Sequence, residues 1–144
     1  MEFTSLRNLN RGYIKLDVWQ KSIQLFKVVY SEINFIQGLN YKLKAQILGA
    51  TQSISSNIAE GYCRKSIKEY IRFLDIALGS SGEVMTRLIG LKSVNKISPQ
   101  FFEEFDNLHY EVENKLIALK KSLQMKQESG NWDTIIREPS DDYG

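Results

Sequence analysis

The sequence predicts an all-α protein, an antiparallel four-helix bundle followed by a flexible acidic C-terminal tail. Hydrophobic residues recur in steps of three and four along four long segments, which is the spacing of amphipathic helices. Both prolines fall late, at Pro99 and Pro139, so residues 13–98 are free of the strongest helix breaker. Four helices joined by short connections pack as mostly antiparallel neighbours around one core.

The first helix is predicted over residues 15–36. Its main apolar stripe consists of Leu16, Trp19, Ile23, Phe26, Tyr30 and Ile33. The following Gln37-Gly38-Leu39-Asn40 offers the glycine and asparagine of a helix stop. More apolar residues lie outside the stripe than one core face needs, namely Val18, Leu25, Val28 and Val29. This surplus favours self-association through the first helix.

The second helix is predicted over residues 41–62. Its apolar stripe is Leu43, Ile47, Ala50, Ile54 and Ile58, and Gly61 is a plausible terminator. A separate stripe of small residues would let another backbone approach closely: Ala45, Gly49, Ser53 and Ser56. The oligomer interface predicted from the first two helices therefore comprises Val18, Leu25, Val29, Ala45, Gly49 and Ser53. Internal packing is the competing explanation for both features.

The third helix is predicted over residues 66–93, with Ser66 and Glu69 at the spacing of a capping box. Its stripe is Ile67, Ile71, Leu74, Leu78, Ser81, Met85 and Leu88. The string Gly79-Ser80-Ser81-Gly82 resembles a loop, but the stripe passes through it without a skip. Two glycines cost a helix about 1 kcal/mol each, which burial of the flanking apolar side chains can outweigh. We therefore predict one long helix with a waist of small residues.

The fourth helix is predicted over residues 98–126. Ser98 is its N-cap, and Pro99 takes the first helical position, where its missing N–H costs nothing. Its stripe is Phe101, Phe105, Leu108, Val112, Leu116, Leu119 and Leu123. The periodicity stops after Gln127, so the predicted bundle domain is 1–127 and the predicted flexible tail is 128–144. That tail holds five acidic side chains and one basic one.

The charge distribution permits a polyanion as partner without requiring one. The net charge is +2, but residues 1–127 carry 18 basic against 12 acidic side chains. The single cysteine, Cys63, excludes an intramolecular disulfide and indicates a reducing compartment. No apolar run has the length of a signal peptide core or a membrane span. We therefore expect a cytoplasmic protein without a membrane partner.

Catalytic and metal-binding patterns are missing from the sequence, which predicts no enzyme, no metal site and no cofactor. His109 is the only histidine, and a Cys63–His109 nucleophile pair would lack an orienting third group. The glycines at 79 and 82 are not followed by the lysine of a P-loop, and no Glu-x-x-His pair suits a di-iron bundle. Glu60 and Glu83 are interpreted as cap, salt-bridge or interface residues.

The best candidate for a functional surface is a basic group around the start of the third helix: Arg64, Lys65, Lys68 and Arg72. Lys65, Lys68 and Arg72 follow spacings of three and four, so they should share a helix face that could contact phosphates. A solvated face that keeps the bundle soluble is the alternative. The second basic cluster is interpreted as a solvated helix end: Lys115, Lys120, Lys121 and Lys126.

Three strings of sequence together resemble a known family. They are Leu16-Asp17-Val18-Trp19-Gln20-Lys21, then Ser56-Asn57-Ile58-Ala59-Glu60-Gly61, then Lys68-Glu69-Tyr70-Ile71-Arg72-Phe73-Leu74 with Ile76-Ala77-Leu78-Gly79-Ser80. Over residues 14 to 123 the chain is similar to the bacterial four-helix bundle proteins. These are often labelled ribosomal-RNA intervening-sequence proteins, because members are encoded within inserts in large-subunit rRNA genes.

The resemblance implies a four-helix bundle that assembles into a ring-like homopentamer and has no enzymatic activity. The accessory proteins of diversity-generating retroelements resemble this family in fold, and they bind nucleic acid and a reverse transcriptase. Many members have a basic pair where this chain has Leu48-Gly49, a proline in place of Ser55 and a glycine in place of Cys63. Two functional hypotheses follow. One is an RNA- or DNA-binding adaptor that acts through the basic group, and the other is a structural or protein-interaction scaffold that binds no nucleic acid.

Overall fold

The computed structural model describes residues 3–7 and 12–130, which form two short 3-10 helices and four long α-helices. Their bounds are η1 Phe3–Ser5, η2 Gly12–Lys15, α1 Asp17–Phe35, α2 Tyr41–Tyr62, α3 Ile67–Ser93 and α4 Pro99–Ser129. No strand occurs within these residues. The predicted all-α class and four-helix bundle are confirmed, and each α-helix begins and ends within three residues of its predicted bounds.

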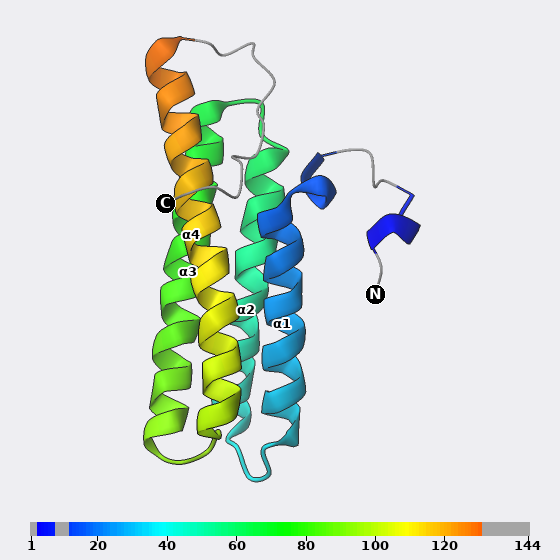
Figure 1. Cartoon of the computed structure of the whole chain (residues 1–144), viewed down its shortest axis with the longest axis vertical. Coiled ribbons are helices and arrows are strands. Elements are labelled where there is room, and N and C mark those ends of the chain that lie inside the picture. The colour runs from blue at the N-terminus through cyan, green and yellow to red at the C-terminus, as the bar shows by residue number, and fades with distance from the viewer. Residues whose placement is uncertain (1–2, 8–11, 131–144) are drawn as a thin grey trace.

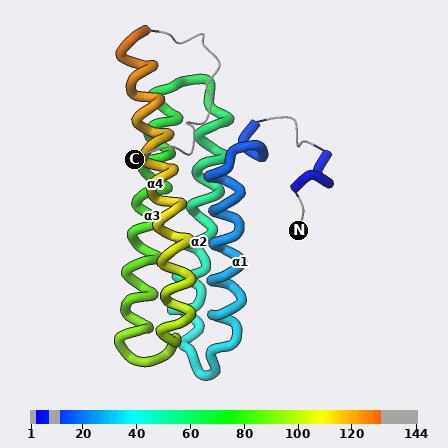
Figure 2. Tube along the Cα trace, in the orientation of Figure 1, coloured from blue at the N-terminus to red at the C-terminus, as the bar shows by residue number. Residues whose placement is uncertain are grey.

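The four α-helices lie side by side along one long axis, and each runs opposite to the helix before it in the chain (Figures 1 and 2). Helix α1 packs against α2 and α4, and α3 packs against the same two helices. The turn between α2 and α3 therefore lies at the same end of the bundle as the start of α1 and the end of α4 (Figure 1). The other end carries the α1–α2 and α3–α4 connections.

Polar side chains cap the starts of three helices. The Asn40 Oδ1 atom accepts a hydrogen bond of 2.8 Å from the backbone N–H of Lys42 at the start of α2. The Ser98 Oγ atom accepts one of 3.1 Å from the N–H of Phe101, which confirms the predicted cap of α4. Each bond satisfies a backbone donor that has no partner within its helix. The cap of α3, at Ser66, belongs to the functional site described below.

The waist of α3 is continuous helix, as predicted, because residues 79–82 lie within Ile67–Ser93. Gly79 and Gly82 face solvent, whereas Ser81 points into the core. The buried Ser81 hydroxyl donates to the carbonyl oxygen of Leu78, 2.8 Å away, so its polar group is satisfied within the helix. Burial of the apolar side chains on both sides of the waist outweighs the low helix propensity of its glycines.

The core runs the length of the bundle and takes side chains from all four helices. The predicted stripes of α2 and α4 are largely buried, although Leu43 at the start of α2 is exposed. In the predicted stripe of α3, Ile71, Leu78 and Met85 are only partly buried, and Tyr70, Ala77 and Val84 belong to the core instead. The predicted stripe of α1 is right only at its two ends, where Leu16 and Ile33 are buried. Between them the buried residues are Val18, Ser22, Leu25 and Val29, and Tyr30 of the predicted stripe is exposed. The α1 helix is therefore rotated relative to the sequence-based expectation.

The end of α4 differs from the predicted domain boundary. The helix continues to Ser129, and Gly130 follows it in the left-handed conformation with a φ of 73°. Glycine carries no penalty in this conformation, and it is the usual residue after a helix C-terminus. Residues 128 and 129 of the predicted tail are thus helical, while residues 131–144 lie outside the described part of the chain.

Candidate functional site

The predicted basic group gathers around the turn between α2 and α3. Arg64, Lys65, Lys68 and Arg72 are all exposed. Arg64 and Lys65 both lie in the turn, so Lys65 does not share the helical face of Lys68 and Arg72 as predicted. The turn is short, however, and all four cations remain at the same end of the bundle. We call this set of residues the basic end.

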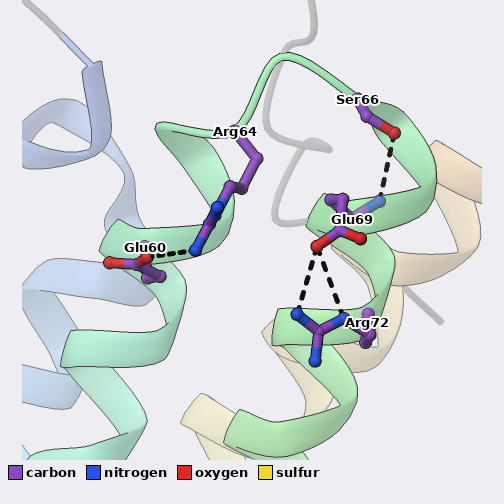
Figure 3. A network of polar contacts seen from close by, with 5 residues as sticks. All are labelled: Glu60, Arg64, Ser66, Glu69 and Arg72. Atoms are coloured by element: carbon purple, nitrogen blue, oxygen red, sulfur yellow. Dashed lines mark hydrogen bonds and ion pairs between the residues drawn. The ribbon is translucent and has the colours of Figure 1, made fainter.

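Two carboxylates pair with the two arginines of the basic end (Figure 3). The Arg64 Nη2 atom lies 2.6 Å from Glu60 Oε1 on the last turn of α2. The Arg72 Nη2 atom lies 3.1 Å from Glu69 Oε2 on the first turns of α3. The Glu69 backbone N–H donates to Ser66 Oγ at 3.3 Å, which forms the hydroxyl half of the predicted capping box. The Glu69 carboxylate is directed to Arg72 and not back to Ser66 (Figure 3).

A phenylalanine lies beneath both arginines. The guanidinium carbon of Arg64 is 5.0 Å from the centre of the Phe73 ring, and that of Arg72 is 4.6 Å away. These are cation–π distances, and Phe73 is 9% exposed. Gly61 makes this arrangement fit, because a Cβ atom there would lie only 2.8 Å from the Cβ atom of Phe73. Sequence reasoning singled out the two arginines but missed Phe73 as their common support.

The charges of the basic end are only partly compensated. Glu60 and Glu69 offset two of its four cations, and neither Lys65 nor Lys68 forms an ion pair with any residue in 3–7 or 12–130. The two ion pairs are exposed, with 42–57% of each side chain accessible to solvent. Exposed pairs of this kind contribute about 0–1 kcal/mol. An incoming anion therefore meets two lysines that pair with no described residue and two arginines in weak, exposed ion pairs.

Three of the six predicted interface residues are too deeply buried to contact a partner chain. Val18, Leu25 and Val29 are fully buried within the single chain, so they belong to its core and not to an oligomer interface. The prediction failed because Ser22 interrupts the true core stripe of α1. Its hydroxyl donates to the carbonyl oxygen of Trp19 at 2.6 Å, which lets a serine occupy a fully buried position.

The other three predicted interface residues lie on the outer side of α2. Ala45 and Gly49 are exposed, and Ser53 is partly exposed and bonded through its hydroxyl to Ser80 of α3 at 2.9 Å. Gly79 on α3 is exposed as well. A Cβ atom added to Gly49 or to Gly79 would meet nothing within 4 Å, so packing within this chain does not require either glycine. We call this surface the small-residue face.

Two lysines of the second basic cluster take part in helix pairing and are not a solvated helix end. The Lys115 Nζ atom lies 2.6 Å from Asp17 Oδ2 on α1, and Lys115 is only 5% exposed. The Lys120 Nζ atom lies 2.6 Å from Asp75 Oδ1 on α3. Both pairs link α4 to a neighbouring helix. The interpretation of these two lysines from the sequence is therefore wrong.

The residues considered for nucleophilic or acid–base chemistry lie apart. His109 is buried, and its Nε2 atom lies 2.8 Å from the carbonyl oxygen of Ser81 in the middle of α3. Cys63 is exposed at the end of α2, about 15 Å along that helix from Ser53, which bonds to Ser80, the neighbour of Ser81. Glu60 and Glu83 are also separated. Glu60 is next to Gly61, which packs on Phe73, and Glu83 lies about 15 Å further along α3 than Phe73. Neither pair converges.

A groove of about 610 Å³ lies between α1 and α4, away from the basic end. Its lining mixes apolar and charged side chains: Val28, Phe35, Phe101, Leu108, Lys27, Glu32 and Glu104, with Gln24 and Ser31. Phe35 is 82% exposed at the end of α1. Among the described residues, no three histidine, cysteine or acidic side chains are grouped as metal ligands. None of the described helices has the length and apolar character needed to cross a membrane.

Comparisons with known proteins place the chain in a family. The model of the 23S rRNA-intervening sequence protein family matches residues 14–118. A crystal structure from Bacteroides thetaiotaomicron, of a protein with unknown function from the S23 ribosomal protein family, is 26% identical with a TM-score of 0.69. That match covers 72% of this chain and 98% of the other. No curated protein matches the chain. The chain belongs to the 23S rRNA-intervening sequence protein family.

Proposed function

We propose that this protein is a non-enzymatic adaptor that binds the backbone of RNA or DNA through its basic end. The observation that carries the proposal is the gathering of Arg64, Lys65, Lys68 and Arg72, all exposed, around one turn at one end of the bundle. Phosphate contacts made by arginine and lysine supply most of the affinity of sequence-independent nucleic-acid binding. The modest charge of one chain would give weak binding by itself.

Assembly into a ring would overcome that weakness, and we propose a homopentamer. The small-residue face supports this proposal, because exposed glycines lower the stability of a helix and packing within this chain does not require them. Ala45, Gly49 and Ser53 are the proposed contact residues, in place of the buried Val18, Leu25 and Val29. Repetition of the basic end around a ring would create a continuous positive band.

A titration of labelled structured RNA and duplex DNA at about 50 and 200 mM salt tests the adaptor. Binding should weaken steeply between the two salt concentrations, because each neutralised phosphate releases counterions. The triple variant Arg64→Ala/Lys68→Ala/Arg72→Ala should abolish it while far-UV circular dichroism stays helical. Lack of binding by the wild-type protein at the lower salt concentration rejects the adaptor.

The second candidate function is a scaffold for a protein partner, and the groove between α1 and α4 favours it. The groove combines apolar and charged side chains, and Phe35 at its edge is an exposed aromatic residue of the kind enriched in protein interfaces. Binding of this kind would depend little on salt. The substitution Phe35→Ser should weaken a scaffold contact and leave nucleic-acid binding unchanged, so the two functions are separable.

A further inference from the structure

We infer that Arg64 and Arg72, which both contact the Phe73 ring, form a paired phosphate clamp. The carboxylates of Glu60 and Glu69 occupy the guanidinium donors until a phosphate displaces them. The inference rests on the proposed nucleic-acid binding and adds to it the ligand group, the supporting residue and an internal competitor. The clamp differs from a general positive patch because its affinity is set by two named carboxylates and one aromatic ring.

The support comes from two elements that meet at one ring. Arg64 lies in the turn after α2, and Arg72 and Phe73 are neighbours on α3. Their guanidinium carbons lie 5.0 and 4.6 Å from the ring centre. The ring is nearly buried, and the contact of Gly61 with Phe73 holds α2 and α3 together beneath it. Two arginines from different segments are thereby held against one ring, which keeps their guanidinium carbons within about 10 Å of each other.

Stacking suits arginine as a phosphate ligand. The five N–H donors of a guanidinium lie in its plane, so contact between its face and a ring leaves the donors available. A side chain already confined by the ring loses less freedom when it binds, which raises affinity. Lys65 and Lys68 would add charge without fixing geometry, because an ammonium group acts as a point charge. The arginines and the ring are thus the geometric part of the basic end.

Glu60 and Glu69 occupy the donors that a phosphate would use. Arg64 donates to Glu60 at 2.6 Å, and Arg72 donates to Glu69 through both Nε and Nη2, at 3.4 and 3.1 Å. Both donors of Arg72 share one oxygen, Glu69 Oε2, whereas a phosphate presents two oxygens to the same two donors in the stronger bidentate form. Both ion pairs are exposed and therefore weak. A phosphodiester can replace each carboxylate. Because each ion pair must be broken first, the two carboxylates lower the net affinity for the phosphodiester.

Neutralising the two carboxylates tests the competition. Glu60→Gln/Glu69→Gln keeps the size of both side chains and removes their charge. The matched control is Glu103→Gln/Asp106→Asn, which changes net charge equally near the start of α4, at the opposite end of the bundle. Binding of a labelled RNA hairpin of about 24 nucleotides, measured by anisotropy at about 100 mM salt, should tighten about three- to tenfold relative to the control. Equal affinities of the two double variants overturn the clamp.

Replacing the ring tests the support. Phe73→Leu keeps an apolar side chain and both arginines, so net charge and the salt dependence should persist while affinity falls about three- to tenfold. Circular dichroism and the thermal midpoint establish that the variant is folded. Unchanged affinity in a folded variant removes Phe73 from the inference. Binding by wild type with no response to either change sustains the adaptor and rejects the clamp, whereas lack of binding by every variant rejects both.

Discussion

At the scale of single residues, Gly61 shows how one missing side chain shapes the site. A Cβ atom at this position would lie 2.8 Å from Phe73 Cβ and 3.0 Å from Tyr70 Cδ1. The Phe73 Cβ atom is fixed by the backbone of α3, so it cannot move away without moving that helix. The sequence offered Gly61 only as a helix terminator, since a close approach between two helices depends on their relative position and not on local spacing.

The substitution Gly61→Ala should therefore lower the free energy of unfolding by about 1–3 kcal/mol, the usual cost of overpacking. The measurement is urea unfolding followed by circular dichroism. Gly90→Ala is the matched control, because a Cβ atom there meets nothing within 4 Å. Removing an exposed helical glycine should raise stability by about 0.5–1 kcal/mol. Equal effects of the two substitutions would contradict the close approach.

Helix capping is the second property that belongs to single residues. Ser98 Oγ accepts the Phe101 N–H at 3.1 Å, and this contact was predictable because caps depend on residues only three apart. Ser98→Ala should cost about 1 kcal/mol of unfolding free energy. Ser98→Asp, which keeps an acceptor at the helix N-terminus, should restore most of it. Loss of the same stability in both variants would show that the cap contributes nothing.

At the scale of helices, sequence periodicity predicted which segments are helical better than which face of each is buried. Helix α1 carries apolar residues around much of its circumference, so two stripes satisfy the spacing rule. The aromatic residues favoured the wrong stripe, and Ser22 disguised the right one. Which stripe faces inward is decided by the neighbouring helices. For the same reason, the sequence predicted that Arg64 and Arg72 lie near each other but not that both contact Phe73.

The ion pair between Lys115 and Asp17 links α4 to α1 at 2.6 Å, with Lys115 almost fully buried. Lys115→Met keeps the aliphatic stem and leaves the Asp17 carboxylate, 36% exposed, without this lysine. We expect a loss of about 1–3 kcal/mol, less than for a completely buried pair because water can reach Asp17. Lys120→Met is the control, and its more exposed pair with Asp75 should contribute less than about 1 kcal/mol. Thermal or chemical unfolding compares them.

At the scale of the whole molecule, the proposed assembly makes a prediction about mass. Light scattering coupled to size exclusion should give about five times the 16.6 kDa of one chain. Gly49→Leu/Gly79→Leu adds side chains where the isolated chain has open space, so the fold should persist while the mass falls toward that of one chain. Asn107→Leu, on the exposed side of α4, should leave the assembly intact. A wild-type mass near 16.6 kDa at micromolar concentration rejects the pentamer.

The waist of α3 also determines how the helices are aligned along the bundle axis. Ser80 bonds through its hydroxyl to Ser53 of α2, and the carbonyl oxygen of its neighbour Ser81 meets His109 of α4. Layers of leucine and isoleucine resemble one another, so a polar contact distinguishes one axial register from another more sharply than apolar packing does. A shift of α3 relative to α4 would leave the buried His109 ring without its Ser81 partner, which should lower the free energy of unfolding by about 1–3 kcal/mol. One polar layer thus favours a single axial register of three helices, and together with the short α2–α3 turn it maintains the alignment of Arg64 with Arg72 at the end of the bundle.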